Sequence, residues 1–255
     1  MQNRNHTTPP PRTSEALEGV LVVDKPAGPT SHDVVYRVRK VFGIRKVGHG
    51  GTLDPLATGV LVLLLGRATR MANLFLGSDK TYEGTMRFGV ATDSHDAAGK
   101  IIAEADCSGV CLEDVTAEFK NWVGDRMQEP PMVSAIKKGG IPLYKYARRG
   151  KEVKREPRLI HVYALSVTAF EHPTVDFVLR CTKGTYVRKI CSDVGEALGC
   201  HAHLTRLRRT ASGELSLDDA IPVNQILQMS RDELERHLLP VWKFSKNRHH
   251  VQDSP

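Results

Sequence analysis

Apolar runs and alternating positions along the chain predict a series of strands. Val20–Val23 is a short apolar run that predicts a strand, and Val60–Leu65 is a longer run typical of a strand buried on both faces. From Tyr82 to Phe88, apolar and polar residues alternate, which predicts a half-buried strand. Val162–Phe170 and Val175–Thr182 also alternate and are separated by a short turn, which indicates an antiparallel hairpin.

Helical periodicity marks three further segments. In Thr30–Phe42 the valines recur at helical spacing, the first residue and Asp33 have the spacing of a capping pair, and Gly43 ends the helix. Leu112–Val123 and Thr185–Leu198 are also predicted to be helical. Because strands and helices mix without regular alternation, we predict an α+β fold with a mainly antiparallel sheet.

The ends of the chain and one internal stretch depart from this pattern. Residues 1–16 are rich in proline and polar residues, so we expect a disordered tail. One domain is expected over residues 17–243, interrupted at about 125–155 by an insertion rich in Pro, Gly, Lys and Arg. Residues 244–255 are expected to be a tail too short for a further packed domain.

The charge distribution indicates a polyanionic partner. The 255 residues are 40% hydrophobic, enough for a sizeable core, and carry a net charge of +7. Nine Lys or Arg residues lie between Lys137 and Arg158, with only two acidic residues among them. Tyr144 and Tyr146 lie within this cluster. Because cations interleaved with aromatic rings suit phosphates and stacked bases, the cluster predicts a nucleic-acid contact.

Other features of the composition argue against several kinds of site. Five cysteines in a chain of this length do not indicate a disulfide framework. Cys200, His201 and His203 lie close together, but no C-x-x-C pair accompanies them, so buried thiols and surface histidines are favoured over zinc. No apolar run of about 18 residues and no signal peptide are present. We therefore expect a cytoplasmic protein with no membrane contact, no metal and no small-molecule cofactor.

The strongest candidate for chemistry is the segment Gly48–Leu61. Its glycines at 48, 50, 51 and 59 surround one acidic residue, Asp54, and permit close backbone approach. Pro55 disfavours helical geometry at Asp54. A single carboxylate on a glycine-rich loop before a buried strand is how a scaffold presents a nucleophile or a base. An ordinary Asp-Pro turn has the same local pattern, so spacing alone leaves both interpretations open.

The amino-acid sequence GGTLDPLATGVL in this segment resembles the catalytic motif of the TruB family of pseudouridine synthases. Further segments along the chain resemble other motifs of that family, in the same order: Asp24–Ser31, Asp79–Tyr82, Pro130–Ala135, Leu143–Arg148, Lys183–Arg188 and Leu204–Arg209. Together they extend from about Gly19 to Thr210, which is most of the chain. The resemblance implies the pseudouridine synthase fold, with a central, mainly antiparallel sheet flanked by helices and a basic RNA-binding insertion.

The resemblance also implies an activity, the isomerisation of the T-loop uridine of tRNA (position 55) to pseudouridine. Asp54 is the implied catalytic carboxylate; whether it attacks C1′, attacks the base or takes the 2′ proton is open. Arg188 is the implied cation that keeps Asp54 ionised and oriented. Tyr82 is the implied aromatic residue that stacks on the flipped uridine, close to the C5 proton that must leave.

Several other residues are assigned to substrate binding by the same resemblance. They are Lys25, His49, Lys145, Arg148, Tyr186 and Leu207. Tyr186 and Leu207 match positions that pack against the base, and His49 matches a histidine beside the flipped nucleotides rather than an acid–base group. Lys25 is a weaker candidate for structural support or a phosphate contact. The other two belong to the basic insertion.

The expected partner is the T-arm stem-loop of tRNA, and we expect a monomer. Two alternatives remain at this point. One is a tRNA-binding or folding factor that opens the tRNA elbow without chemistry. The other is the catalytic subunit of a guide-RNA-directed rRNA pseudouridine synthase, which is less favoured because such proteins carry a C-terminal RNA-binding domain that we do not expect in this sequence.

Overall fold

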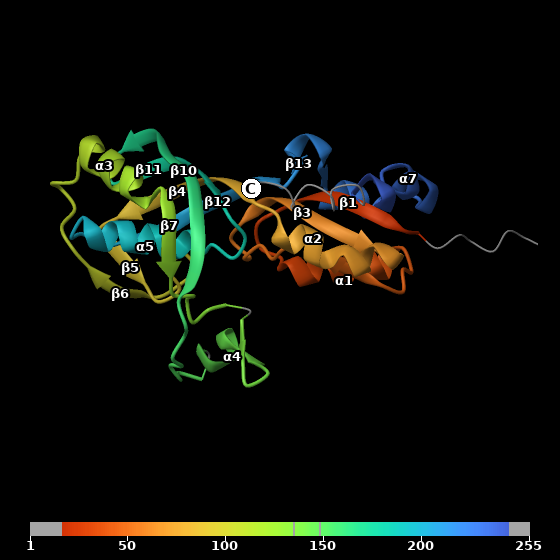
Figure 1. The fold of residues 1–255 in the computed structure, drawn as a ribbon, viewed down its shortest axis with the longest axis horizontal. Coiled ribbons are helices and arrows are strands. Elements are labelled where there is room, and N and C mark those ends of the chain that lie inside the picture. The colour runs from red at the N-terminus through yellow and green to blue at the C-terminus, as the bar shows by residue number, and fades with distance from the viewer. Residues whose placement is uncertain (1–16, 135, 148, 245–255) are drawn as a thin grey trace, which may run out of the picture.

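Strands and short helices are mixed along the whole chain. The computed structural model describes residues 17–134, 136–147 and 149–244 (Figure 1). The strands are β1 (Gly19–Lys25), β2 (Val47–His49), β3 (Thr58–Leu65), β4 (Lys80–Phe88), β5 (Val90–Thr92), β6 (Ile101–Glu104), β7 (Gly124–Gln128), β8 (Lys137–Lys138), β9 (Ile141–Pro142), β10 (Arg158–Glu171), β11 (Thr174–Cys181), β12 (Ala202–Ser212), β13 (Leu215–Ser216) and β14 (Ile221–Pro222). The helices are α1 (Ser31–Val41), η1 (Gly66–Met71), α2 (Ala72–Gly77), α3 (Leu112–Trp122), α4 (Leu143–Ala147), α5 (Val187–Ala197), η2 (Leu217–Asp219), α6 (Val223–Ile226), α7 (Arg231–Arg236) and η3 (Val241–Phe244), where η denotes a 3₁₀ helix. The tails expected at residues 1–16 and 244–255 lie outside the described residues, apart from Phe244, which closes η3.

Within the described chain, ten strands form one large sheet. Its order is β14-β1-β3-β12-β4-β11-β10-β7, with β2 paired to β3 and β13 paired to β12. The β1–β14 and β3–β12 pairs are parallel, and the other pairs of this sheet are antiparallel. The mixed fold with a mainly antiparallel sheet confirms the predicted α+β class.

The periodicity of the sequence explains the burial of the individual strands. All residues of β3 after Thr58 are buried, as expected for a strand in the middle of a sheet with both faces covered. In β4 the residues Tyr82, Gly84, Met86 and Phe88 are buried and alternate with more exposed ones. The predicted hairpin is formed by β10 and β11 in antiparallel register.

The helices cover the sheet where their apolar faces predict. Helix α1 begins with the expected capping box, in which Asp33 N donates to Thr30 Oγ1 (3.1 Å) and Thr30 N donates to Asp33 Oδ2 (2.8 Å). The helix ends at Val41 with Phe42 as its C-cap, and Gly43 follows with a φ of +62°. Helix α1 contacts β2, whereas α3 contacts β10 and α5 contacts β12 (Figure 1).

The sheet has a seam where β3 meets β12, and a glycine makes it. In the described chain, the backbone register between these strands covers two residue pairs, Thr58 with Arg208 and Gly59 with Arg209. Gly59 has a φ of +96°, and a Cβ atom there would lie 2.2 Å from Arg209 O. The two backbones can therefore approach this closely only because residue 59 has no side chain.

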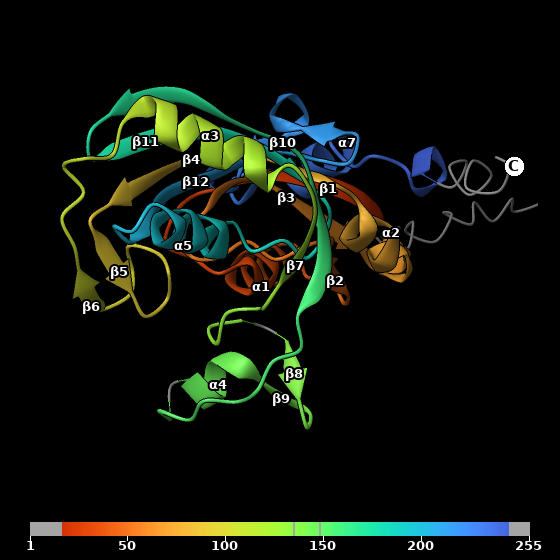
Figure 2. The same cartoon turned by 60° about the vertical axis from the view of Figure 1, so that its left-hand side comes forward.

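The predicted insertion starts later than expected. Residues 124–128 form β7 and pair with β10, so they belong to the large sheet and not to the insertion. The chain leaves the sheet after Gln128 and returns at Arg158. Between these points, β8, β9 and α4 stand away from the sheet on two connecting segments (Figure 2).

Candidate active site

A cavity of about 250 Å³ lies at the centre of the large sheet. Its walls come from the loop before β3, from β4 and β12, and from the N-terminus of α5. Five of the predicted site residues line it: Asp54, Tyr82, Tyr186, Arg188 and Leu207. Segments more than 130 residues apart in sequence therefore meet here, as the Asp54–Arg188 contact illustrates.

Asp54 and Arg188 form an ion pair in this cavity. Arg188 Nε donates to Asp54 Oδ2 over 3.0 Å. The arginine side chain is 3% exposed and the carboxylate 42%, so the cation lies behind the acid and the acid faces the opening. The remaining guanidinium nitrogens donate to the carbonyl oxygens of Ser94 (3.3 Å) and Val133 (2.6 Å). These contacts hold the guanidinium in one orientation.

The loop that carries Asp54 is held at the residues on both sides of it. Arg209 donates to three carbonyl oxygens, those of Gly51 (3.1 Å), Thr52 (3.2 Å) and Val60 (2.7 Å). A second anchor acts next to Asp54, because the hydroxyl of Ser31 donates to Leu53 O (3.0 Å) and accepts from Leu53 N (2.8 Å).

The other side of Asp54 is fixed through Pro55. Gly28 N donates to Pro55 O over 2.9 Å, and Lys25 Nζ lies 3.4 Å from the same oxygen. Ala57 N also donates to Asp54 O over 3.1 Å, which closes a turn. With both flanks fixed, the carboxylate has little freedom to leave the cavity.

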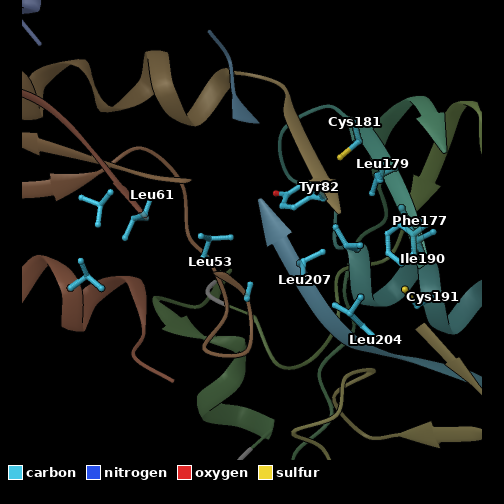
Figure 3. Packing of buried hydrophobic residues seen from close by; sticks show 14 of the residues in the cluster. Leu53, Leu61, Tyr82, Phe177, Leu179, Cys181, Ile190, Cys191, Leu204 and Leu207 are labelled. Carbon is cyan, nitrogen blue, oxygen red and sulfur yellow. The ribbon is translucent and has the colours of Figure 1, made fainter. Parts of the chain in front are cut away.

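Tyr82 lies on β4 and is 8% exposed. Figure 3 shows its ring beside Leu207, with the hydroxyl directed toward the loop that carries Leu53. Burial raises the pKa of Tyr82, and nearby Arg209 opposes this shift. The hydroxyl therefore stays protonated at neutral pH, and its oxygen offers lone pairs rather than a phenolate charge.

Tyr186 and Leu207 complete the wall around the carboxylate. The ring of Tyr186 lies against the Arg188 guanidinium, 5.6 Å from ring centroid to Cζ. Leu207 is 7% exposed and pairs with Gly84 across β12 and β4. Two tyrosine rings and a leucine side chain thus line the cavity beside the carboxylate and give it aromatic and aliphatic surface.

Two buried cations of this site, Lys80 and Arg209, lie within the family motifs, but the sequence predicts no role for either. Arg209 holds the Asp54 loop, and Lys80 Nζ donates to the carbonyl oxygens of Phe75, Leu76 and Ser78. Burial lowers the pKa of Lys80 to about 8, and nearby Arg209 acts in the same direction. Both residues line the cavity and are at most 6% exposed.

Three other predicted residues that the structure describes, Lys25, His49 and Lys145, do not line the cavity. Lys25 is fully buried beneath the Asp54 loop, where burial lowers its pKa to about 8 and Asp54 opposes this shift. His49 is partly buried, its pKa is lowered by burial, and its Nδ1 accepts from Gly51 N (3.4 Å). Lys145 is exposed on α4. Arg148 lies outside the described residues.

Comparison with known proteins identifies the family of this chain. Residues 39–187 match the family model described as TruB family pseudouridylate synthase (N terminal domain), and residues 188–243 match that of the tRNA pseudouridylate synthase B C-terminal domain. The chain belongs to the TruB family. This confirms the resemblance that the sequence motifs indicated.

Relatives in this family are similar along most of the chain. The tRNA pseudouridine synthase B of Opitutus terrae is 48% identical over 227 residues, which are 89% of this chain and 94% of that protein. The tRNA pseudouridine synthase B of Syntrophotalea carbinolica is 47% identical over 225 residues, 88% of this chain and 74% of that protein.

Solved structures confirm the pseudouridine synthase fold. A chain of a Cbf5-Nop10-Gar1 complex superposes with a TM-score of 0.71 at 29% identity, covering 90% of this chain. A chain of an H/ACA RNP bound to a substrate RNA containing 2′-deoxyuridine gives a TM-score of 0.67 at 26% identity, again over 90% of this chain. This chain spans 62% and 61% of the lengths of those two chains.

Neither a membrane span nor a metal cluster is found among the described residues. None of the described helices is long and apolar enough to cross a membrane. In the same part of the chain, no three His, Cys, Asp or Glu side chains are grouped as a metal would require.

Proposed function

We propose that this protein isomerises the uridine at position 55 of the tRNA T-loop to pseudouridine. The observation that carries the proposal is the accessible Asp54 carboxylate in the central cavity, backed by the buried Arg188 and faced by Tyr82. The relatives named tRNA pseudouridine synthase B support tRNA as the substrate.

The reaction needs no oxidant, reductant or water. The N1–C1′ bond breaks, the uracil turns, and C5 bonds to C1′; C5 then loses its proton and N1 gains one, so that atoms balance. Asp54 acts at C1′, at the base or at the 2′ proton, and each role requires an ionised and accessible carboxylate. Arg188 supplies the compensating charge and fixes the direction of the carboxylate.

The walls of the cavity fit the other demands of this reaction. The uridine must leave its stack and enter the cavity, where Tyr82, Tyr186 and Leu207 offer aromatic and aliphatic surface to the base. Because Tyr82 is protonated, its oxygen would receive the C5 proton only as its own proton moves on, or would orient another acceptor. The same walls would retain the uracil while its glycosidic bond is broken.

The basic insertion supplies a second contact with RNA in this proposal. Lys137, Lys138, Lys145, Arg149 and Lys154 are exposed there. The exposed cations of this insertion would bind phosphates of the T-arm and hold the T-loop of the RNA over Asp54. Lys145 and Arg148, which the family resemblance assigns to substrate binding, are part of this proposed surface.

Incubation of the purified chain with an unmodified tRNA transcript tests the proposal. We expect one pseudouridine, at position 55, by carbodiimide modification and primer extension, without any guide RNA or second protein. A transcript with cytidine at position 55 is the matched control and should show no stop. Binding without modification would instead support a folding factor, and modification only with an added guide RNA would support a guide-directed subunit.

A further inference from the structure

Gln128 joins the base of the insertion to the N-terminus of α5. It is the last residue of β7 and is 3% exposed. Its Oε1 accepts from Tyr186 N over 2.8 Å, and its Nε2 donates to Tyr186 O over 3.1 Å. A backbone N–H can only donate and a carbonyl can only accept, so the two bonds fix the side-chain amide in one orientation. The amide therefore holds the backbone of Tyr186 at two points.

The first turn of helix α5 starts at the residue that this contact holds. Tyr186 is its N-cap residue, but the tyrosine side chain makes no capping hydrogen bond. Tyr186 O accepts from Lys189 N (3.1 Å) and Ile190 N (3.2 Å), which begins the helix. Gln128 binds this same peptide oxygen, so it sets where the first turn of α5 starts.

Arg188 lies in that first turn, two residues after Tyr186. The backbone position of Tyr186 therefore determines where the arginine side chain starts on its way to Asp54. The Tyr186 ring also packs against the guanidinium. A shift of Tyr186 would therefore move both the backbone from which the Arg188 side chain extends and the ring against which its guanidinium packs. A displacement of about 1 Å in such a group can cost on the order of 100-fold in rate.

The insertion contacts Arg188 directly, through the segment that leaves the sheet after Gln128 (residues 129–134, the outgoing segment). Val133, which follows Gln128 along the outgoing segment, accepts a hydrogen bond from Arg188 Nη2 over 2.6 Å. The chain thus contacts the site twice as it leaves the sheet: Gln128 binds the backbone of Tyr186, and Val133 binds the guanidinium of Arg188. Ser94 O is the other carbonyl that accepts from the Arg188 guanidinium, and it comes from a different loop.

We propose that Gln128 is a positioning residue, which couples the base of the RNA-binding insertion to the Asp54–Arg188 ion pair. The inference rests on the proposed function, since it assigns Gln128 to the isomerisation. Gln128 does not line the cavity and acts through Tyr186 and Arg188. RNA bound to the insertion would in this way influence the geometry of the ion pair through the outgoing segment.

The variant Gln128→Met tests the coupling, because methionine keeps the size of the side chain and removes both hydrogen bonds. We expect kcat to fall on the order of 10- to 100-fold, while KM for tRNA changes less than about threefold. Gln225→Met, at an exposed position of α6, is the matched control and should keep wild-type kcat. A fall confined to KM, or an unchanged kcat, would overturn the proposal.

Two further measurements separate positioning from general destabilisation. In an Arg188→Lys background, Gln128→Met should lower the residual kcat by less than about threefold, since both changes act on one ion pair; fully multiplicative effects would contradict the coupling. Gln128→Glu, which keeps one acceptor for Tyr186 N, replaces the methionine variant if the latter does not fold.

A crystal structure of Gln128→Met gives a readout that does not depend on activity. We expect the contact between Arg188 Nε and Asp54 Oδ2, 3.0 Å in the native chain, to lengthen beyond hydrogen-bond range. An unchanged contact would overturn the inference even if the native chain made no pseudouridine. Absence of pseudouridine with the native chain, together with a lengthened contact in the variant, would refute only the proposed function.

Discussion

The loop around Asp54 and the basic insertion are built in opposite ways. In the loop, the backbone of residues 51–55 is bound by Arg209, Ser31 and Gly28, all from other elements. In the insertion, several hydrogen bonds are internal, such as Lys138 Nζ to Lys154 O (2.7 Å) and Tyr146 OH to Lys138 O (3.3 Å). The loop is thus fixed to the sheet, whereas the insertion is held largely by itself.

Their cations differ in the same way. Three cations are buried near Asp54 and donate hydrogen bonds to backbone carbonyls: Lys25, Lys80 and Arg209. In the insertion, Lys145 and Arg149 are exposed. A buried cation bound to carbonyls shapes the protein, and an exposed one is available to a phosphate. The comparison separates two tasks: the loop should determine the rate of the chemical step, and the insertion should determine affinity for RNA.

The largest expected effect is on the loop side of this comparison. Asp54→Asn should lower kcat on the order of 1,000-fold or more, since the amide has nearly the same size but is a poor nucleophile and base. Affinity for tRNA, measured by filter binding, should stay within about threefold. The control is Asp232→Asn, at an exposed position in the first turn of α7. Turnover near the native rate would remove Asp54 from the chemistry.

The next effect concerns the cation behind the carboxylate. Arg188→Ala removes the bond to Asp54 and leaves the carbonyls of Ser94 and Val133 without their donor. We expect kcat to fall about 100- to 1,000-fold in single-turnover assays, and Arg188→Lys, which keeps the charge, to lose less. Arg67→Ala, which breaks an exposed pair with Glu18, should leave kcat unchanged. Equal losses in the lysine and alanine variants would mean that charge plays no part.

On the insertion side the change should appear in affinity. Replacing Lys145, Arg149 and Lys151, all exposed, by alanine should raise KM about tenfold and leave kcat within about twofold. The slope of log K against log salt concentration should fall by about 2 to 3, since three fewer counterions are released. Neutralising the exposed Lys100, Lys120 and Arg236 is the control. An unchanged slope would place the RNA elsewhere.

The smallest expected effect tests whether the buried cations have a structural role. The pKa of Lys25 is lowered by burial to about 8 from 10.5, so between these values the unfolded chain binds more protons than the native one. The contribution of Lys25 to the free energy of unfolding should therefore rise with pH, by about 1 kcal/mol per pH unit between about 8 and 10. Urea unfolding of the native chain and of Lys25→Met gives this contribution as their difference. A flat difference over this range would show that the ammonium is not buried.

Much of the fold could be predicted because its signals are local. The alternation in β4, the apolar run of β3 and the capping box of α1 each lie within a few residues and reflect burial or capping directly. Strand β7 gave no such signal. Its one large apolar residue, Met127, is 65% exposed, so pattern alone assigned the segment to the insertion.

The site was predicted less completely because its supports are long-range. Arg209 donates to Gly51 O, which lies 158 residues away in the sequence, and no local pattern near either residue predicts that contact. Lys80 likewise reads as an ordinary cation before a strand, yet it is buried against three carbonyls of the preceding segment. Gln128 lies between a short edge strand and a basic stretch, and its two bonds to Tyr186 become visible only in the folded chain.

The position of β12 in the sheet determines when the active site can form during synthesis of the chain. This strand lies between β3 and β4, both of which leave the ribosome more than 100 residues earlier. It brings Leu207 to the cavity and Arg209 to the Asp54 loop. The carboxylate and Tyr82 are thus synthesised early but lack their neighbours until about residue 212 has emerged. We expect a nascent chain that lacks β12 to be inert toward RNA, and activity to appear only after this strand has emerged and paired with β3 and β4.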